Sequence, residues 1–307
     1  MSVDYLRISA LGLPFAIIAL AGQGFLRGVG DLKLPLLIVV AANAANVVLE
    51  VLFVYGFGWG LAGSAWGTVI AQAGMGLAFV LALLGVSGGL RRPRWLEVRP
   101  LLKIGGDIEV RTAALLLSFA LAGAVVARVG EASLGAHQVA FQLFLFLALV
   151  LDAIAIAGQI IVGRALGAGD AEGAYGAAGR MIFWSVALGA LFAVALLVSG
   201  DALPELFTDD PAVIGRAAEI WPLFALMQPM GAAVFALDGI LIGAGDTRFL
   251  KWSMLAAFLT FAPLALGALF FGLGLVGVWV SLLALMAVRL VTCGARFVGR
   301  RWAVVGA

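Results

Sequence analysis

Nine apolar segments, each twenty residues or longer, limit what this chain can fold into. They run over 8–27, 34–55, 61–86, 107–129, 134–165, 174–199, 218–243, 249–271 and 274–297. A helix rises about 1.5 Å per residue, so about twenty residues cross roughly 30 Å of hydrocarbon. Membrane β-strands would instead alternate apolar and polar residues over about ten positions. The continuous runs therefore predict an all-α polytopic membrane protein with about nine transmembrane helices.

The composition agrees with a bilayer as the surroundings of this chain. Charged residues make up 12% of the sequence, against about 25% in a typical soluble domain, and the mean hydropathy is +1.15. The lone Cys293 and the lone His137 exclude an intrachain disulfide and any site built from several Cys or His ligands. We expect no cofactor, no enzyme activity and no nucleic-acid partner.

Two stretches 215 positions apart repeat one pattern. Residues 11–31 and 226–246 are identical at eight positions, and the shared endings are Gly28, Gly30 and Asp31 in one copy and Gly243, Gly245 and Asp246 in the other. Solenoid repeats are much shorter, about 20–50 residues, so this period indicates two copies of one large unit. We expect each glycine pair to end a helix in a left-handed conformation and each aspartate to cap the next helix.

Two further glycine patterns, at 58–63 and 272–277, match the dinucleotide fingerprint G-x-G-x-x-G. That fingerprint requires a preceding strand and an acid about twenty residues on, and neither copy has them. Tight turns between membrane helices explain these glycines better.

The loop charges alternate along the chain. Arg and Lys follow the first, third, fifth, seventh and ninth segments, while the other loops are neutral, mixed or acidic. By the positive-inside rule the basic loops are cytoplasmic, and the amino terminus begins outside. The second half has six segments and the first only three, so we expect three helices to be missing at the front. We divide the chain into a partial amino-terminal lobe (1–87), a basic cytoplasmic linker (88–106) and a carboxy-terminal lobe (107–307).

Asp152 is the strongest candidate for a coupling residue. It lies twelve residues before Arg164, which places it roughly 18 Å from the cytoplasmic end of its helix. An intramembrane carboxylate is costly unless it faces a cavity or a partner, so function is the default hypothesis and a bond to a neighbouring helix is the alternative. Gln159 shares its helical face, and Gln142 adds polar atoms toward the outer end, which suggests that part of this helix lines water.

The remaining candidates have more balanced interpretations. Asp238 lies about one and a half turns inside its helix, and Gln23 is its counterpart in the first copy. Glu50 fits a functional role and a helix-to-helix bond equally well. Asp107 opens a helix, where an i,i+4 pair with Arg111 and a capping role are favoured.

The segment 134–170 carries the most specific resemblance. It contains Ala136-His-Gln, Leu151-Asp-Ala, then Gln159 followed by Val162-Gly-Arg and Gly169-Asp170. This order resembles the multidrug and toxic compound extrusion (MATE) family, and more narrowly its DinF-like branch. The resemblance implies twelve helices in two six-helix lobes, of which this chain would hold helices four to twelve. It also implies efflux of organic, often cationic, compounds in exchange for protons or sodium ions.

Two departures from the family pattern bear on the coupling ion. Gln159 stands where many DinF-like relatives have Glu, and the acid of the sodium-coupled branch falls at Gly231. We therefore expect protons rather than sodium, with Asp152 as the main coupling residue and Asp238 as the secondary one. Gln159, Gln142, Gln23 and Glu50 would complete a polar cavity.

A multi-pass transporter of the inner or plasma membrane is thus the leading hypothesis. A lipid-linked saccharide flippase of the same superfamily and a non-transporting fragment remain alternatives. A flippase would need a cavity rich in Arg and Lys, and the cationic residues here lie almost entirely in loops. An integral-membrane enzyme would need clustered ligands or a nucleophile with its base, and neither is visible.

Overall fold

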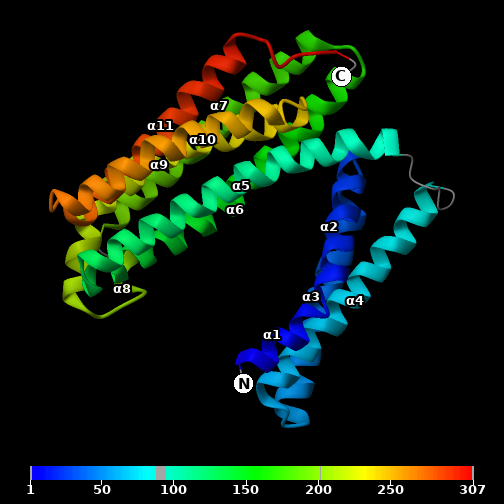
Figure 1. Cartoon of the computed structure of the whole chain (residues 1–307), viewed down its shortest axis with the longest axis horizontal. Coiled ribbons are helices and arrows are strands. Elements are labelled where there is room, and N and C mark those ends of the chain that lie inside the picture. Colours follow the sequence, from blue (N-terminus) through cyan, green and yellow to red (C-terminus); the bar gives the residue numbers. More distant parts are fainter. Residues whose placement is uncertain (1, 88–94, 201, 306–307) are drawn as a thin grey trace. The chain divides into compact units, whose positions relative to one another are not determined.

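The computed structural model describes residues 2–87, 95–200 and 202–305, and every element in these ranges is a helix (Figure 1). Contacts divide the chain into two compact units, Met1–Arg94 and Trp95–Ala307. The division falls inside the predicted linker 88–106. Residues 88–94 of that linker lie outside the described residues, and helix α5 occupies the rest of it from Trp95 onward.

Unit 1 is a small bundle around one long helix. Its elements are α1 (Ser2–Ala10), α2 (Leu13–Gly28), α3 (Lys33–Val51), a π-helical turn η1 (Leu52–Gly56) and α4 (Gly60–Ser87). Helix α4 packs against both α2 and α3. Gly22 on α2 lies directly against Phe79 on α4. A Cβ at this position would come within 2.8 Å of the Phe79 side chain, so only glycine allows this approach. The close approach buries the small core of Ala19, Leu26 and Phe79.

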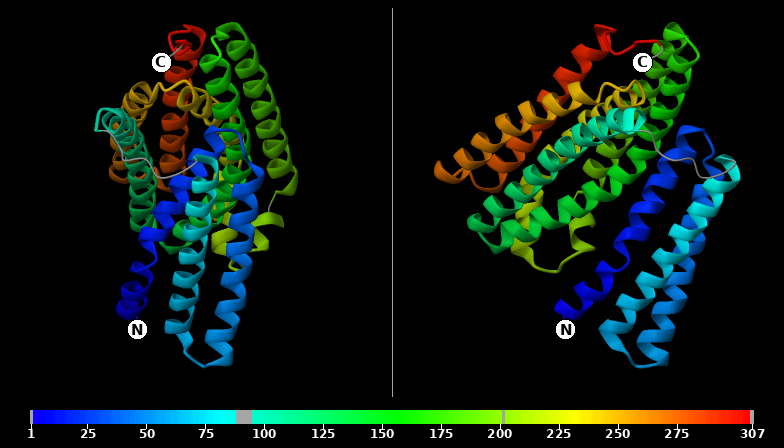
Figure 2. Two further views of the ribbon diagram at one scale, coloured as in Figure 1. Left: turned by 90° about the vertical axis from the view of Figure 1, so that its right-hand side faces the viewer. Right: turned by 45° about the vertical axis from the view of Figure 1, so that its right-hand side comes forward.

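Unit 2 contains the larger core. Its elements are α5 (Trp95–Val129), α6 (Glu131–Gly167), α7 (Ala171–Ser199), α8 (Ala202–Glu205), α9 (Pro211–Gly243), α10 (Thr247–Phe270) and α11 (Gly274–Val298). Helix α10 packs against both α5 and α11, and α11 packs against α9. The ribbons of α5, α10 and α11 run side by side in Figure 1, and Figure 2 shows unit 2 from two other sides. Two apolar clusters fill the interior, one around Phe224 and Trp279 and the other around Ile240 and Trp302.

Helix α9 is the centre of unit 2. Within its most apolar stretch 72% is buried, whereas the corresponding stretches of the other candidate membrane spans of this unit are 17–44% buried. It packs against α6, α7 and α11, and small residues allow the close approach. A Cβ at Gly239 would overlap the backbone of Ala155 on α6, and one at Gly243 would overlap that of Gln159. The repeated stretch 226–246 is therefore the buried axis of this unit.

Eight of the described helices are long and apolar enough to cross a membrane, judged by length and composition. They match eight of the nine predicted segments. The ninth segment, 8–27, was predicted as one continuous helix. This is wrong, because α1 ends at Ala10 and α2 starts at Leu13. Pro14 lies in the first turn of α2, where a residue without an N–H is tolerated, whereas inside a helix it would break the hydrogen-bond ladder.

The second glycine of each repeated turn has the predicted left-handed backbone, whereas Gly28 and Gly243 are the last residues of α2 and α9 and do not have it. Gly30 and Gly245 have φ of 79° and 75°, and the N–H groups of Asp31 and Asp246 donate to carbonyls five residues earlier, both at 2.9 Å. A third copy ends α6, where Gly169 has φ of 84°. Gly58, Gly60, Gly272 and Gly274 also have positive φ and join consecutive helices, as tight turns should.

The two repeat aspartates differ in their side-chain bonds. Asp31 Oδ1 accepts from the N–H groups of Lys33 and Leu34, as predicted for a cap. Asp246 makes no such capping bond, and its Oδ2 accepts from Arg296 Nε at 2.6 Å. The capping prediction is therefore wrong for Asp246, because the end of α11 brings a guanidinium within reach of this carboxylate.

Candidate functional site

A cavity of about 630 Å³ opens between helices of unit 2. Its wall is mostly apolar and aromatic, with Leu115, Leu116 and Phe119 from α5, Phe141, Phe144 and Leu145 from α6, Phe235 from α9 and Met286 from α11. Volumes of about 300–1,000 Å³ are typical of small-molecule sites. The size and lining suit a drug-sized aromatic compound.

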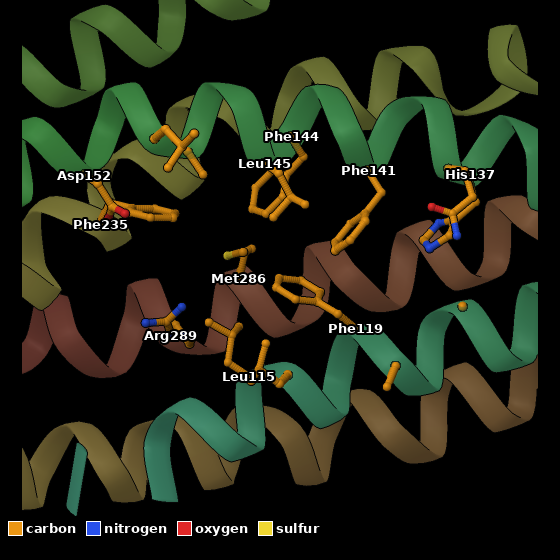
Figure 3. A pocket seen from close by; sticks show the side chains of 16 residues that line it. Leu115, Phe119, His137, Phe141, Phe144, Leu145, Asp152, Phe235, Met286 and Arg289 are labelled. Atoms are coloured by element: carbon orange, nitrogen blue, oxygen red, sulfur yellow. The ribbon is translucent and has the colours of Figure 1, made fainter. Parts of the chain in front are cut away.

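Polar groups lie at the two ends of this cavity (Figure 3). Asp152 on α6 and Arg289 on α11 face the same end, next to Phe235, and His137 lies at the opposite end beside Phe141. The ring of His137 stacks on Phe141 with centroids 5.8 Å apart, and its Nδ1 has no partner among the described residues. His137 is thus a packed residue, as expected of a lone histidine, and it also lines the cavity.

Asp152 is the exposed carboxylate of this site. Its helix α6 carries Leu151 and Ala155 toward the core, and Asp152 falls on the open side. In the described part of the chain its side chain makes no hydrogen bond and no ion pair. Arg111 and Asp238 are the charged groups that act on it electrostatically. Asp152 therefore lies at the wall of the cavity, and its role as a coupling residue stays a prediction.

Asp238 has the opposite surroundings. It is buried on α9, and its Oδ2 accepts from the guanidinium groups of Arg111 on α5 and Arg289 on α11. Its Oδ1 has no partner in the described ranges. One carboxylate therefore joins three helices through two ion pairs.

The predicted local pair between Asp107 and Arg111 is wrong. Asp107 accepts from Lys251 on α10, and Arg111 reaches across to Asp238. Helix α10 packs along α5 and brings Lys251 to Asp107. The predicted capping role of Asp107 is also wrong, because α5 begins at Trp95 and Asp107 lies inside this helix. The i,i+4 rule applies where solvent surrounds a helix face, and here neighbouring helices supply better-placed charges.

Arg289 is the residue that sequence reasoning missed. It is 3% exposed and lies inside α11, where it interrupts an otherwise uncharged run from Gly274 to Gly294. A cation in such a run is a functional or pairing signal by itself, because an unpaired charge in hydrocarbon costs several kcal/mol. The position of Arg289 inside an apolar segment therefore distinguishes it, from the sequence alone, from the arginines of the loops.

The structure does not gather every predicted site residue. Gln142 and Gln159 are exposed on α6 and contribute nothing to the lining of this cavity, whereas Gln138 does line it. Gln23 and Glu50 belong to unit 1. There Gln23 accepts from Arg27 at 3.2 Å, and Glu50 accepts from Ser64 at 2.8 Å.

Unit 1 has a second polar feature of its own. A hollow of about 170 Å³ between α3 and α4 is lined by Asn43, Asn46, Thr68 and Gln72. Asn46 Nδ2 and Gln72 Oε1 are buried there without a partner among the described residues. The described ranges contain no group of three or more His, Cys, Asp or Glu side chains that could hold a metal ion.

Comparison with known proteins identifies the family. The MatE family profile matches residues 1–52 and 110–266. Protein DETOXIFICATION 44, chloroplastic, of Arabidopsis thaliana is 34% identical over 302 residues, covering 97% of this chain and 57% of that protein. DNA damage-inducible protein F of Escherichia coli (strain K12) is 30% identical over 293 residues, covering 93% of this chain and 63% of that protein.

A solved structure supports the fold. The crystal structure of MATE in the bent conformation aligns with a TM-score of 0.86 at 19% identity, covering 97% of this chain and 68% of that one. The chain spans about half the length of the curated relatives it matches first. Because the family profile matches well over half of the 307 residues, the chain belongs to the multidrug and toxic compound extrusion (MATE) family.

Proposed function

We propose that the protein exports organic, often cationic, compounds across a cell membrane by antiport, with protons entering in exchange. Asp152 takes up the proton, and the same carboxylate attracts the substrate. The observation that carries this proposal is an exposed carboxylate without a partner in the described chain, at one end of a large aromatic cavity. A proton and an organic cation each neutralise the same charge, so one displaces the other.

The neighbouring acid suits a different role. Asp238 already has two guanidinium partners, so a proton or a substrate cation arriving there would have to displace an arginine. We propose that Asp238 anchors α5 and α11 to α9, rather than serving as the secondary coupling residue. Asp152, Asp238, Arg111 and Arg289 carry two negative and two positive charges, so the empty site is balanced when Asp152 is ionised.

The flippase alternative gains some support from Arg111 and Arg289, which lie inside the bundle rather than in loops. Both guanidinium groups are bound to one carboxylate, however, and the cavity lining contains one acid, one arginine and an aromatic wall. A pyrophosphate would need several uncommitted cations. Efflux of aromatic compounds fits this lining better.

Proton release on binding tests the role of Asp152 in the 307-residue chain itself. The purified chain is titrated with tetraphenylphosphonium in weak buffer, at values from about pH 5 to pH 8. We expect up to one proton released per cation bound at the lower pH values, and none from Asp152→Asn. Asp170→Asn is the matched control, because Asp170 caps α7 at the end of the bundle and asparagine caps equally well. Unchanged release from Asp152→Asn would show that Asp152 does not carry the proton.

A further inference from the structure

Arg289 has more hydrogen-bonding capacity than Asp238 uses. Its Nη2 donates to Asp238, and its Nε and Nη1 groups donate to no residue in the described part of the chain. Arg111 Nε is enclosed by protein without a partner, whereas no atom of Arg289 is enclosed in that way. Arg289 also lines the cavity. A guanidinium with unused N–H groups at a cavity wall can donate them to a carboxylate of a bound molecule.

The local charge supports the same conclusion. Asp238 with its two arginines has one positive charge in excess, and this excess lies at the end of the cavity that Arg289 lines. Asp152 contributes a negative charge from the facing helix α6 (Figure 3). One end of the cavity therefore has a negatively charged carboxylate and a positively charged guanidinium, and aromatic side chains line the cavity beyond them.

On the basis of the proposed function, we infer that this cavity selects zwitterionic aromatic compounds. The cationic group of the substrate lies near Asp152, its carboxylate accepts from the unused N–H groups of Arg289, and its aromatic body packs against Phe141, Phe144 and Phe235. Such a substrate has no net charge and leaves the balance of the site unchanged, which matters where the dielectric is low. Arg289 is then the residue that determines specificity for the carboxylate.

Two dyes that differ at one group test this inference. Rhodamine 110 carries a cationic xanthene and a free carboxylate, and rhodamine 123 is its methyl ester, with the cation alone. Binding of each dye to the purified 307-residue chain is measured by fluorescence anisotropy, and the ratio of the two dissociation constants is compared between variants. The comparison between variants cancels the different partitioning of the two dyes into detergent.

Arg289→Gln is expected to weaken rhodamine 110 binding at least about tenfold and to change rhodamine 123 binding far less. Arg289→Lys keeps a charge for Asp238 but loses the fork of donors, and it should also favour the ester relative to the wild type. This second variant decides the question if the glutamine variant does not fold. Arg216→Gln removes an exposed arginine paired with Glu219 and should leave the ratio unchanged.

An equal loss of both dyes in Arg289→Lys would assign Arg289 a structural role and overturn the inference. Absence of rhodamine 110 binding to the wild-type chain would overturn it as well. Neither result touches the proposed antiport, because proton release by tetraphenylphosphonium is measured separately and involves no carboxylate.

Discussion

Replacement of Asp238 by asparagine removes the charge that holds two arginines inside unit 2. The Asp238 side chain is 8% exposed, and its partners Arg289 and Arg111 are 3% and 16% exposed. Loss of one partner from a buried ion pair costs about 3–5 kcal/mol, because the other charge is left uncompensated. Asparagine still offers one carbonyl acceptor, so we expect about 3 kcal/mol. For a domain of about 200 residues this corresponds to a fall in Tm of about 6–12 °C.

The assay is thermal unfolding of the purified chain in detergent. The measured quantity is the fraction of protein that remains monodisperse at each temperature. Asp152→Asn is the matched control, because it makes the same chemical change at a carboxylate with no partner in the described chain. Its unfolding free energy should change by no more than about 0.5 kcal/mol. Equal losses of Tm in the two variants would refute the assignment of Asp238 as the anchor and Asp152 as the uncommitted acid.

A second substitution separates charge from packing. In Asp238→Asn combined with Arg289→Gln, one of the two stranded charges is gone, so part of the lost stability should return. Residues in one buried network typically show coupling energies of about 0.5–3 kcal/mol in such a cycle. Strictly additive losses would mean that the two side chains do not interact as their geometry indicates.

Three further predictions concern packing and topology. Gly239→Ala should destabilise the chain by about 1–3 kcal/mol or more, because its Cβ would overlap the backbone of α6. A Cβ added at Gly231 would have no neighbouring atom within 4 Å, so Gly231→Ala should be neutral or slightly stabilising in the same unfolding assay. Lys251→Gln should lower Tm through the loss of its bond to Asp107, and Lys251→Arg should largely preserve it. A cysteine at Gly89, in a background without the native cysteine, should be labelled by an impermeant reagent only from the cytoplasmic side, and labelling from outside would contradict the predicted topology.

Local features of the sequence predicted eight of the nine long helices and the left-handed glycines of the turns, and they singled out Asp152 as a candidate. A continuous apolar run specifies a helix by its length, and a glycine with positive φ follows from the chirality of the other residues. Asp152 was identified because a charge in hydrocarbon needs an explanation. Each of these inferences depends on the residues themselves and on close neighbours in the chain.

The charge partners could not be obtained in the same way. Arg111 pairs with a residue 127 positions away, and Lys251 with one 144 positions away. These pairs depend on which helices are adjacent, and apolar periodicity says little about adjacency when nearly every face is apolar. The local pair of Asp107 with Arg111 was the best choice without that knowledge, and it was wrong because helices α9 and α10 supplied competing partners.

The two copies of the repeat keep their backbone and differ in charge. Gln23 and Asp238 occupy equivalent positions, seven residues before left-handed glycines with nearly equal φ. Gln23 accepts from Arg27 on its own helix, whereas Asp238 accepts from arginines of two other helices. The hydrogen bond of Gln23 lies within one helix and contributes nothing to the packing between helices. The carboxylate of Asp238 accepts from arginines of two other helices and therefore links three helices. In unit 2 the ion pairs of Asp238 join α5, α9 and α11 and do not include Asp152. Under the proposed function, Asp152 would therefore exchange a proton for a substrate without breaking the ion pairs that hold these three helices together.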